Sequence, residues 1–355
     1  MNDGATVPAT PWAERPTLDF DLSRPVSQLA ATLPPGALEA GRRLLGAILP
    51  SIPRRARMVA DWARLRTAWR FQREVSGVAR LIGASWRDIV LANVSYDLLL
   101  GTMGCSTVVL PTPSGPVVAR NMDWWPEDLL AQASYLIRCS RACTFHFAHA
   151  GFPGSIGSVT GLSARGFAVV LNAVVCAEGR RWLGYPVLLH LRRVLEDAAD
   201  FDDALRMLSR QRLAAPALFT LAGSRNEQRV VIERTPSRYA LRRPAGDEPL
   251  LTTNDYRLLT AAQSHDPADA LLRTACPRYE RLGLLLAKHR PDQEVTDEAL
   301  LYALSDAGVI QDITAQHVVM RPRAGEARLF VPRRLLGDEA SGAASARRSD
   351  HTPAG

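Results

Sequence analysis

The chain has 355 residues, of which 47% are hydrophobic, so it can bury a sizeable core in one or two domains. Its formal net charge is +7, but the positive charge comes almost entirely from arginines that are interleaved with acidic residues, and we therefore expect no nucleic-acid binding. Its five cysteines are odd in number and too few for a disulfide scaffold, which indicates free thiols in a reducing compartment.

Residues 1–35 are rich in proline and are expected to be extended. They contain acidic residues and no apolar stretch of the kind that forms a signal peptide. No part of the chain reaches the roughly eighteen uninterrupted apolar residues of a transmembrane helix. These features predict a cytoplasmic protein.

Residues 35–100 carry apolar side chains at helical spacing and are predicted to be helical. Ser85 is expected to cap the last of these helices and Gly101 to end it. One helix carries an apolar stripe surrounded by arginines, made of Met58, Trp62, Leu65 and Trp69. We expect the stripe to pack on the body of the protein, with contact to an anionic membrane or micelle surface as the alternative.

After Gly104 the sequence changes to short apolar runs separated by proline and glycine turns, which is typical of strands. The predicted order is strands in 105–175, two helices in 183–211, strands in 216–257, helices in 273–309 and a closing hairpin in 314–332. The chain therefore divides into a helical N-terminal segment (1–104), a strand-rich body (105–333) and a small, polar tail (334–355) that is expected to be disordered. The class is α+β.

Cys105 begins the first predicted strand, a place where a cysteine is usually a small buried hydrophobic residue. Arg120 and Asp123 lie on the strand that returns from a short Pro-Gly turn, and a hairpin would bring both beside the thiol. An arginine favours the thiolate. An aspartate repels a thiolate, so it would instead hold a cation, such as the α-amine of Cys105 if the Gly104–Cys105 bond were cut.

A freed α-amine would also supply a base for the thiol. Its reference pKa is about 8, and a nearby arginine lowers it, so the neutral amine can accept the thiol proton without a histidine. No catalytic motif surrounds His146, His149, His190 or His317. Cys139 and Cys143 have the spacing of half a metal site but lack a second pair. We therefore expect no metal and no cofactor.

Asn172 and Asn254 each follow an apolar run, in "GFAVVLNAVV" and "PLLTTNDYR". Asparagine is unfavourable inside strands. Its side-chain amide is a good donor to an oxyanion that develops during acyl transfer. The alternative is that each asparagine only forms a turn.

Residues 83–332 resemble the acid ceramidase and N-acylethanolamine-hydrolysing acid amidase group of the choloylglycine-hydrolase-like N-terminal-nucleophile hydrolases. The resemblance is carried by four ordered motifs: "DIVLANVSYDLLLGTMGCSTVVLPTPSGPVVARNMDWW", "GSVTGLSARGFAVVLN", "LAAPALFTLAGSRNEQRVVIERTP" and "TTNDYR". It implies a four-layer αββα sandwich. The N-terminal segment would become a separate α-chain that stays docked on the body after autocleavage.

The resemblance also implies roles for the matching positions. Cys105 would be the nucleophile, exposed by autocleavage after Gly104. Arg120 would lie beside the thiol, and Asp123 would hold the amine. The asparagines of the oxyanion and substrate-positioning shell would be Asn172 and Asn254. The arginine that follows the second asparagine would be Arg278 in "CPRYERL", with Arg281 as the alternative.

The activity that the resemblance implies is hydrolysis of N-acyl amides, such as fatty-acyl amides, N-acylethanolamines or ceramide-like lipids. The alternatives are an acyltransferase that uses the same thioester, or an inactive lipid-binding relative. Residues 1–104 contain no cysteine, so packing alone would hold the two pieces together, whereas some relatives have a disulfide there. An acidic residue that some relatives carry after the first asparagine has no clear counterpart, Glu178 being the nearest, so no acid pH optimum is implied.

Overall fold

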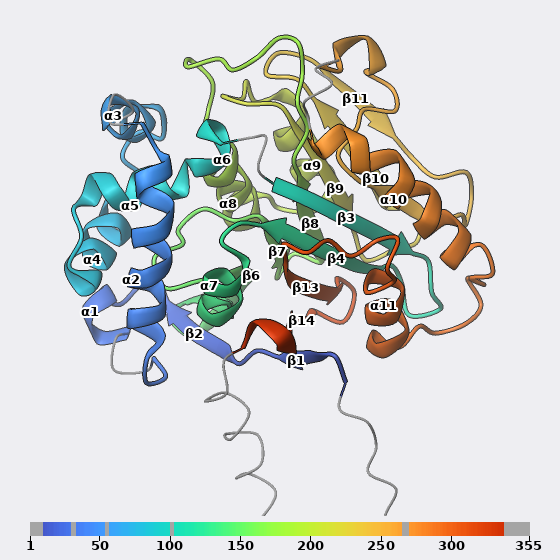
Figure 1. Ribbon diagram of the computed structural model, residues 1–355, viewed down its shortest axis with the longest axis horizontal. Helices are drawn as coiled ribbons and strands as arrows, with labels where there is room; N and C mark the ends of the chain where they lie inside the picture. The colour runs from blue at the N-terminus through green and yellow to red at the C-terminus, as the bar shows by residue number, and fades with distance from the viewer. Residues whose placement is uncertain (1–9, 30–32, 54–56, 100–102, 265–269, 337–355) are drawn as a thin grey trace, which may run out of the picture.

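Two β-sheets pack face to face, and helices cover the outer faces of both (Figure 1). The computed structural model describes residues 10–29, 33–53, 57–99, 103–264 and 270–336. Within these ranges, no helix is long and apolar enough to cross a membrane.

The first sheet has six strands, and two neighbours in it, β3 and β4, form the hairpin that begins near Cys105. In spatial order the strands are β1 (Trp12–Glu14), β14 (Glu326–Pro332), β13 (Thr314–Arg321), β4 (Val117–Trp124), β3 (Met103–Leu110) and β12 (Leu250–Thr252). All neighbouring pairs are antiparallel.

The second sheet has eight strands. Their order is β11 (Tyr239–Arg242), β10 (Arg229–Arg234), β9 (Ala217–Ala222), β8 (Phe167–Asn172), β7 (Thr160–Ser163), β6 (Thr144–Gly151), β5 (Tyr135–Arg141) and β2 (Thr17–Asp21). The pairing is antiparallel except between β2 and β5. Four of these strands, β7 to β10, are buried along their whole length because the middle of the sheet is covered on both faces.

The helices divide among three places around the sheets (Figure 1). On the outer face of the six-stranded sheet lie α10 (Ala270–Leu286) and α11 (Asp297–Leu304). On the outer face of the eight-stranded sheet lie α8 (Val187–Asp197) and α9 (Phe201–Arg210). At one end of the sandwich stand α1 (Val26–Leu29), α2 (Ala37–Ile48), α3 (Arg57–Arg66), α4 (Gln72–Ile82), α5 (Trp86–Asn93), α6 (Ser95–Leu98) and α7 (Glu127–Ala133).

Apolar side chains fill all three interfaces between these layers. Val109, Val170 and Leu218 pack between the two sheets, and Val108 and Leu282 pack between the six-stranded sheet and α10. Each such side chain that leaves water contributes about 1.5–3 kcal/mol to folding. The expected four-layer αββα sandwich is therefore present.

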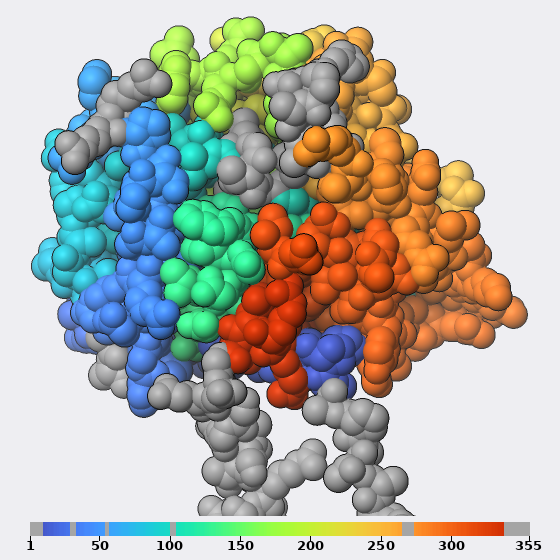
Figure 2. Space-filling model, in the orientation of Figure 1, coloured from blue at the N-terminus to red at the C-terminus, as the bar shows by residue number. Residues whose placement is uncertain are grey.

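The N-terminal segment is held to the body by both helices and strands. Its helix α2 packs against α7, as the blue and green regions of Figure 2 show. Its short strands β1 and β2 add an edge strand to each sheet, which the proline-rich sequence of residues 1–35 did not indicate. Ser85 caps α5 in a capping box with Asp88, as expected, whereas the expected stop at Gly101 lies outside the described residues. The tail is described only to residue 336.

Candidate active site

The hairpin of β3 and β4 places the candidate nucleophile. Its turn is closed by Gly115, which has φ of 95° and donates to Thr112 across a distance of 3.0 Å. The resulting register sets Cys105 opposite Met122 and Gly104 opposite Asp123. The pairing therefore confirms the prediction that the hairpin brings residues 120–123 beside residues 105 and 106.

The two faces of this hairpin carry different parts of the cluster. Cys105 and Arg120 lie on the face toward the second sheet, where Arg120 Nη1 donates to Thr160 of β7 at 2.5 Å. Asp123 lies on the other face, toward α10 and α11. The alternation of side chains along a strand produces this division.

The thiol of Cys105 is buried and lies against a guanidinium group. Arg120 Nη2 is 2.7 Å from Cys105 Sγ, and the side chain of Arg120 is fully buried. Burial raises the pKa of the thiol, while Arg120 lowers it and the nearby carboxylate of Asp123 raises it. A hydrogen bond from the backbone of Ala173 also lowers this pKa. Formation of the thiolate at this buried site therefore depends on Arg120 and on the backbone N–H of Ala173.

Asp123 has one satisfied oxygen and one free one. Oδ1 accepts from Thr314 Oγ1 at 2.6 Å, whereas buried Oδ2 has no hydrogen-bond partner among the described residues. The nearest cation is Arg278, whose Nη1 is 4.0 Å from Oδ2. Burial raises the pKa of Asp123, and the charge of Arg278 lowers it. A free oxygen in this setting is an open acceptor beside the backbone of Gly104.

The carboxylate of Asp123 also leaves little space for a side chain at position 104. A Cβ atom at position 104 would lie 2.9 Å from Asp123 Oδ2 and 3.1 Å from its Cβ. Real side chains do not approach so closely, so only glycine leaves room for the aspartate here. The glycine thus permits the carboxylate to lie directly against the peptide bond that precedes Cys105.

The backbone of Cys105 is held by Asn254 and Arg278. Its N–H donates to Asn254 Oδ1 at 3.0 Å, and its carbonyl accepts from Arg278 Nη1 at 2.7 Å. Arg278 Nη2 also donates to Asn254 Oδ1, at 2.7 Å. Of the two arginines left open by the sequence, Arg278 lies in the cluster, and Arg281 is directed to Asp306 at the surface.

Asn172 is near the cluster but does not touch the thiol. Its Nδ2 donates to the carbonyls of Thr252 and Thr253 at 3.1 and 3.0 Å, and its Oδ1 accepts from Thr107 at 2.8 Å. Both of its N–H groups are therefore engaged. In this arrangement Asn172 ties the end of β8 to β3 and β12, and so positions the backbone of Ala173 beside Cys105.

Three buried threonines belong to the cluster and were not indicated by the sequence. They are Thr107, Thr160 and Thr314, which contact Asn172, Arg120 and Asp123. Threonine is a common strand residue, so its presence in "CSTVVL" or "SVTGLS" carries no signal of a site. Only the pairing of the two sheets reveals these partners.

The remaining singled-out residues lie outside the cluster. Glu178 accepts from Arg238 and Ser237 near the surface. Cys139 is buried and Cys143 is exposed. Within the described ranges, no three His, Cys, Asp or Glu side chains gather as a metal site. Burial lowers the pKa of three of the histidines to about 3, 3 and 4, for His149, His190 and His317.

The solved structure of the Caenorhabditis elegans N-acylethanolamine-hydrolysing acid amidase orthologue superposes with a TM-score of 0.51 and 21% identity, over 67% of this chain and 96% of that one. The two chains therefore share the N-terminal-nucleophile hydrolase fold, as expected.

The sequence is similar to curated amidases. Acid ceramidase from Balaenoptera acutorostrata scammoni is 26% identical in an alignment of 192 residues that covers 46% of this chain and 47% of that protein. The N-acylethanolamine-hydrolysing acid amidase of Caenorhabditis elegans is 27% identical in an alignment of 178 residues that covers 46% of this chain and 50% of that protein. The matched region thus spans about half the length of these relatives.

The sequence profile of one family matches residues 110–306, which is more than half of the chain. The match begins five residues after Cys105 and includes Arg120, Asp123, Asn172, Asn254 and Arg278. The family resemblance inferred from the sequence motifs is therefore confirmed. The chain belongs to the acyl-coenzyme A:6-aminopenicillanic acid acyl-transferase family.

Proposed function

We propose that this protein is a cysteine amidase that hydrolyses N-acyl amides through an N-terminal nucleophile exposed by autocleavage. The observation that carries the proposal is the surroundings of Cys105: a guanidinium on its thiol and an open carboxylate oxygen beside the backbone of Gly104, the residue before it. The similarity to acid ceramidase and to N-acylethanolamine-hydrolysing acid amidase supports acyl amides as the substrate class.

Maturation would begin with Cys105 Sγ attacking the carbonyl carbon of Gly104. The peptide C–N bond breaks, a thioester forms, and the departing nitrogen takes up the proton that the thiol releases. Water then hydrolyses the thioester to a carboxylate on Gly104 and a free thiol on Cys105. The new ammonium would be held by Asp123 Oδ2, the buried oxygen without a partner, and by Asn254 Oδ1.

Catalysis would use the same groups in a second cycle. The neutral amine of Cys105 accepts the thiol proton, Sγ attacks the amide carbonyl, and the proton passes to the leaving amine. Water, activated by the same amine, then hydrolyses the acyl thioester. Arg120 would favour the thiolate throughout.

The oxyanion would be stabilised by Asn254 Nδ2 and the backbone N–H of Ala173. Asn254 Nδ2 donates one hydrogen bond to the carbonyl of Ala173, which leaves it a second N–H. Asn172 would act as a positioning residue, because both of its N–H groups are engaged with the backbone of Thr252 and Thr253. Loss of one oxyanion donor typically lowers kcat about 10²–10³-fold.

The proposal predicts two pieces on a denaturing gel and by intact mass, divided between Gly104 and Cys105. Cys105→Ala should give one intact piece and no hydrolysis of a panel of N-acyl amides. Cys139→Ala, at another buried cysteine, is the matched control and should still be cleaved. An uncut wild type with amidase activity would refute autocleavage, and a cleaved protein whose thiol resists alkylation would favour an inactive relative.

Acyl transfer to an amine is the second candidate, because the matching family is described as an acyl-transferase. It would use the same thioester, with an amine in place of water as the acceptor. Adding hydroxylamine or ethanolamine to the assay separates the two reactions. An N-acylated amine as the main product would favour transfer, and a free acid would favour hydrolysis.

We also propose that the exposed apolar side chains of α3 and of the turn that follows it contact a membrane or micelle surface. The predicted stripe does not lie on one helix, because α3 ends at Arg66 and Trp69 lies in the next turn with a φ of 62°. Met58, Leu65 and Trp69 are 78%, 68% and 51% exposed, whereas Trp62 packs edge-on against Trp182. Packing on the body thus accounts for only one of the four side chains. Co-sedimentation with anionic vesicles should fall in Trp69→Glu, and equal binding by wild type and variant would contradict the contact.

A further inference from the structure

One buried polar atom near the candidate site lacks a hydrogen-bond partner. Gln316 of β13 is 2% exposed, and its Oε1 has no partner among the described residues. The other end of the amide is fixed, since Nε2 donates to Ser134 Oγ at 2.6 Å. Ser134 gives its own proton to the carbonyl of Leu130 at 2.6 Å, so its hydroxyl can only accept from Gln316. Oε1 is therefore the open atom, and a buried acceptor without a donor lowers stability.

Gln316 lines a cavity of about 30 Å³. The volume exceeds the roughly 10–15 Å³ that admits one water molecule, so the cavity has room for a small group of atoms. Its walls also include Met122 and Trp124 of β4, Leu130 of α7 and Val159.

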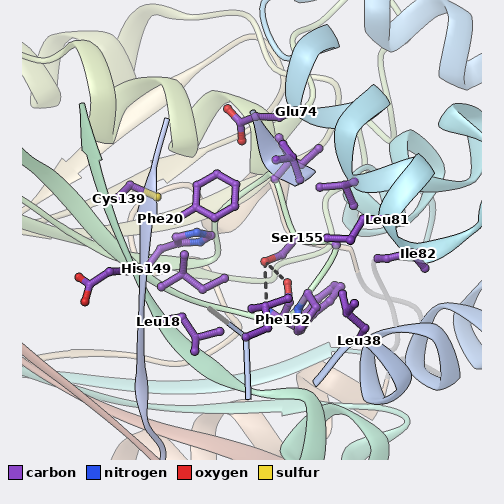
Figure 3. A pocket seen from close by; sticks show the side chains of 18 of the residues that line it. Leu18, Phe20, Leu38, Glu74, Leu81, Ile82, Cys139, His149, Phe152 and Ser155 are labelled. Carbon is purple, nitrogen blue, oxygen red and sulfur yellow. Dashed lines mark hydrogen bonds between the residues drawn. The ribbon is translucent and has the colours of Figure 1, made fainter. Parts of the chain in front are cut away.

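Two other polar side chains in this wall, Asn93 and Ser155, are already engaged. Asn93 Nδ2 donates to two backbone carbonyls, and its Oδ1 accepts from two backbone N–H groups. Ser155 Oγ bonds to the carbonyl and to the N–H of Phe152 at 2.9 and 3.0 Å, as the dashed lines in Figure 3 show. Among the described residues that line the cavity, none is charged. Such a wall favours a neutral ligand group that donates one hydrogen bond to Gln316.

The sheet register places Gln316 in one row with the candidate nucleophile. Gln316 is opposite Met122, and Met122 is opposite Cys105. Residues that are directly paired carry their side chains on the same face of a sheet. Neighbouring strands are about 4.7–4.9 Å apart, so Gln316 lies about 10 Å from Cys105 along this row. A group attached to the thiol therefore reaches Gln316 by crossing Met122.

A β-bulge in β13 turns Gln316 toward this face. The pairing shifts between Thr314, which is opposite Asp123, and Gln316. Asp123 and Met122 are adjacent in β4, so their side chains point to opposite faces. The extra residue, Ala315, directs Thr314 to the face of Asp123 and Gln316 to the face of Met122. Bulges often re-aim a side chain in this way beside an active site.

We propose that Gln316 Oε1 is a specificity site that accepts a hydrogen bond from a hydroxyl group on the acyl part of the substrate. The inference rests on the proposed function, because it places the reacting carbonyl at Cys105. The row of about 10 Å sets the hydroxyl several bonds beyond that carbonyl, at about the sixth carbon of the acyl chain. The substrates are then amides of hydroxylated acids rather than of plain fatty acids.

A hydroxyl suits this position better than the other neutral donors do. A water molecule needs roughly 2–4 polar partners, whereas Asn93 and Ser155 leave it none and Gln316 offers one oxygen. An amide N–H brings a carbonyl that needs a donor of its own, and both N–H groups of Asn93 are engaged. A hydroxyl on an alkyl chain satisfies Oε1 and leaves its carbons against the apolar wall.

Three amides test the site with the full-length protein as purified: the N-ethanolamides of hexanoic, 2-hydroxyhexanoic and 6-hydroxyhexanoic acid. Wild type should favour the 6-hydroxy amide over the hexanoyl amide about tenfold in kcat/KM, because only that amide satisfies the buried acceptor. The 2-hydroxy amide should show no such gain, since its hydroxyl lies too close to Cys105. Gln316→Met keeps a side chain of similar volume without the acceptor and should bring the first ratio to about one.

Gln132→Met is the matched control. Gln132 Nε2 donates to the carbonyl of Leu335, and Gln132 is not part of the cavity wall, so this variant should keep the wild-type ratio. If Gln316→Met does not fold, Gln316→Leu replaces it. A wild-type ratio of about one, or the same ratio in wild type and in the Gln316 variant, would overturn the proposal.

Crystals locate the hydroxyl without any need for turnover. 6-Hydroxyhexanoic acid bound to the wild-type protein should place its hydroxyl oxygen about 2.7–2.8 Å from Gln316 Oε1. A water molecule that stays on Oε1 at saturating acid, or an acid bound elsewhere, would overturn the site. Protein that hydrolyses none of the three amides would refute the proposed function, while the position of the acid would still test Gln316.

Discussion

At the scale of single residues, the site is defined by what surrounds one thiol. Cys105 lies in a dry setting that raises its pKa, and the 2.7 Å contact from Arg120 works against that rise. Asp123, which lies on the other face of the hairpin, raises the pKa of the thiol. The two charges can therefore serve different partners, the thiol and the backbone nitrogen, although they are only three positions apart.

Replacing Arg120 by glutamine should raise the pKa of the thiol, because the thiolate loses its adjacent cation. An opposite charge at this range is worth about 1–3 pKa units, so the midpoint of iodoacetamide labelling against pH should move upward by that order. Arg281→Gln removes an exposed guanidinium that pairs with Asp306 and is the control. A labelling profile that coincides with wild type would show that Arg120 does not act on the thiol.

At the scale of elements, α6 connects the segment before the proposed cleavage site to the body. Tyr96 donates to the carbonyl of Pro216 at 2.7 Å, and Asp97 accepts from the N–H of Val187 at the start of α8. Both side chains are buried. The residues just before the proposed cleavage site are thus fixed by contacts made far along the sequence.

Asp97 should make the stability of the protein depend on pH. Burial raises its pKa to about 7, above the reference value of about 3.9, so the folded protein binds the proton more tightly than the unfolded chain does. The resulting stabilisation is complete below about pH 4 and is lost as the pH rises through 7. Asp97→Asn keeps an acceptor oxygen and should flatten the fall in Tm between pH 5 and 8. Asp202→Asn, at an exposed position on α9, is the control. If Tm falls with pH as steeply in Asp97→Asn as in the wild type, Asp97 is not the group responsible.

At the scale of the whole molecule, the N-terminal segment is part of the core. It supplies edge strands to both sheets and the helices that cover one end of the sandwich. A buried ion cluster joins it to α8: Arg192 contacts Glu74 of α4 at 3.1 Å and Glu196 at 2.8 Å. If the chain is cleaved after Gly104, as we propose, these contacts would hold the two pieces together in place of a disulfide.

Arg192→Met should loosen that association, because it removes the cation that pairs with Glu74, whereas Glu196 still pairs with Arg70. Breaking a buried pair costs about 3–5 kcal/mol. The cleaved protein should then separate into two peaks on size-exclusion chromatography at lower urea than wild type. Arg87→Met, at the exposed Arg87–Asp61 pair, should change little, since such pairs are worth about 0–1 kcal/mol. Co-elution at the wild-type urea midpoint would show that apolar packing alone is sufficient.

Local sequence was enough to predict the hairpin and much of its chemistry. Strand-forming runs on either side of a Pro-Gly turn determine the register, and the register alone sets Asp123 opposite Gly104 and Arg120 opposite Thr107. The helix capped by Ser85 also follows from a pattern that is contained within a short segment, whereas the αββα layers were implied by the family resemblance. The strands β1 and β2 were missed because they are short edge strands, whose pairing depends on sheets formed by later residues.

The sequence by itself determined the strand-and-helix order and a candidate set around Cys105, because periodicity and turn residues act over a few positions. Only the tertiary structure decided which members of that set contact one another. It brought Arg278 rather than Arg281 to Asn254, engaged Asn172 with the backbone, and left Asp123 Oδ2 open beside Gly104. These outcomes depend on which buried polar atoms find partners, and that is settled by contacts between segments far apart in the chain.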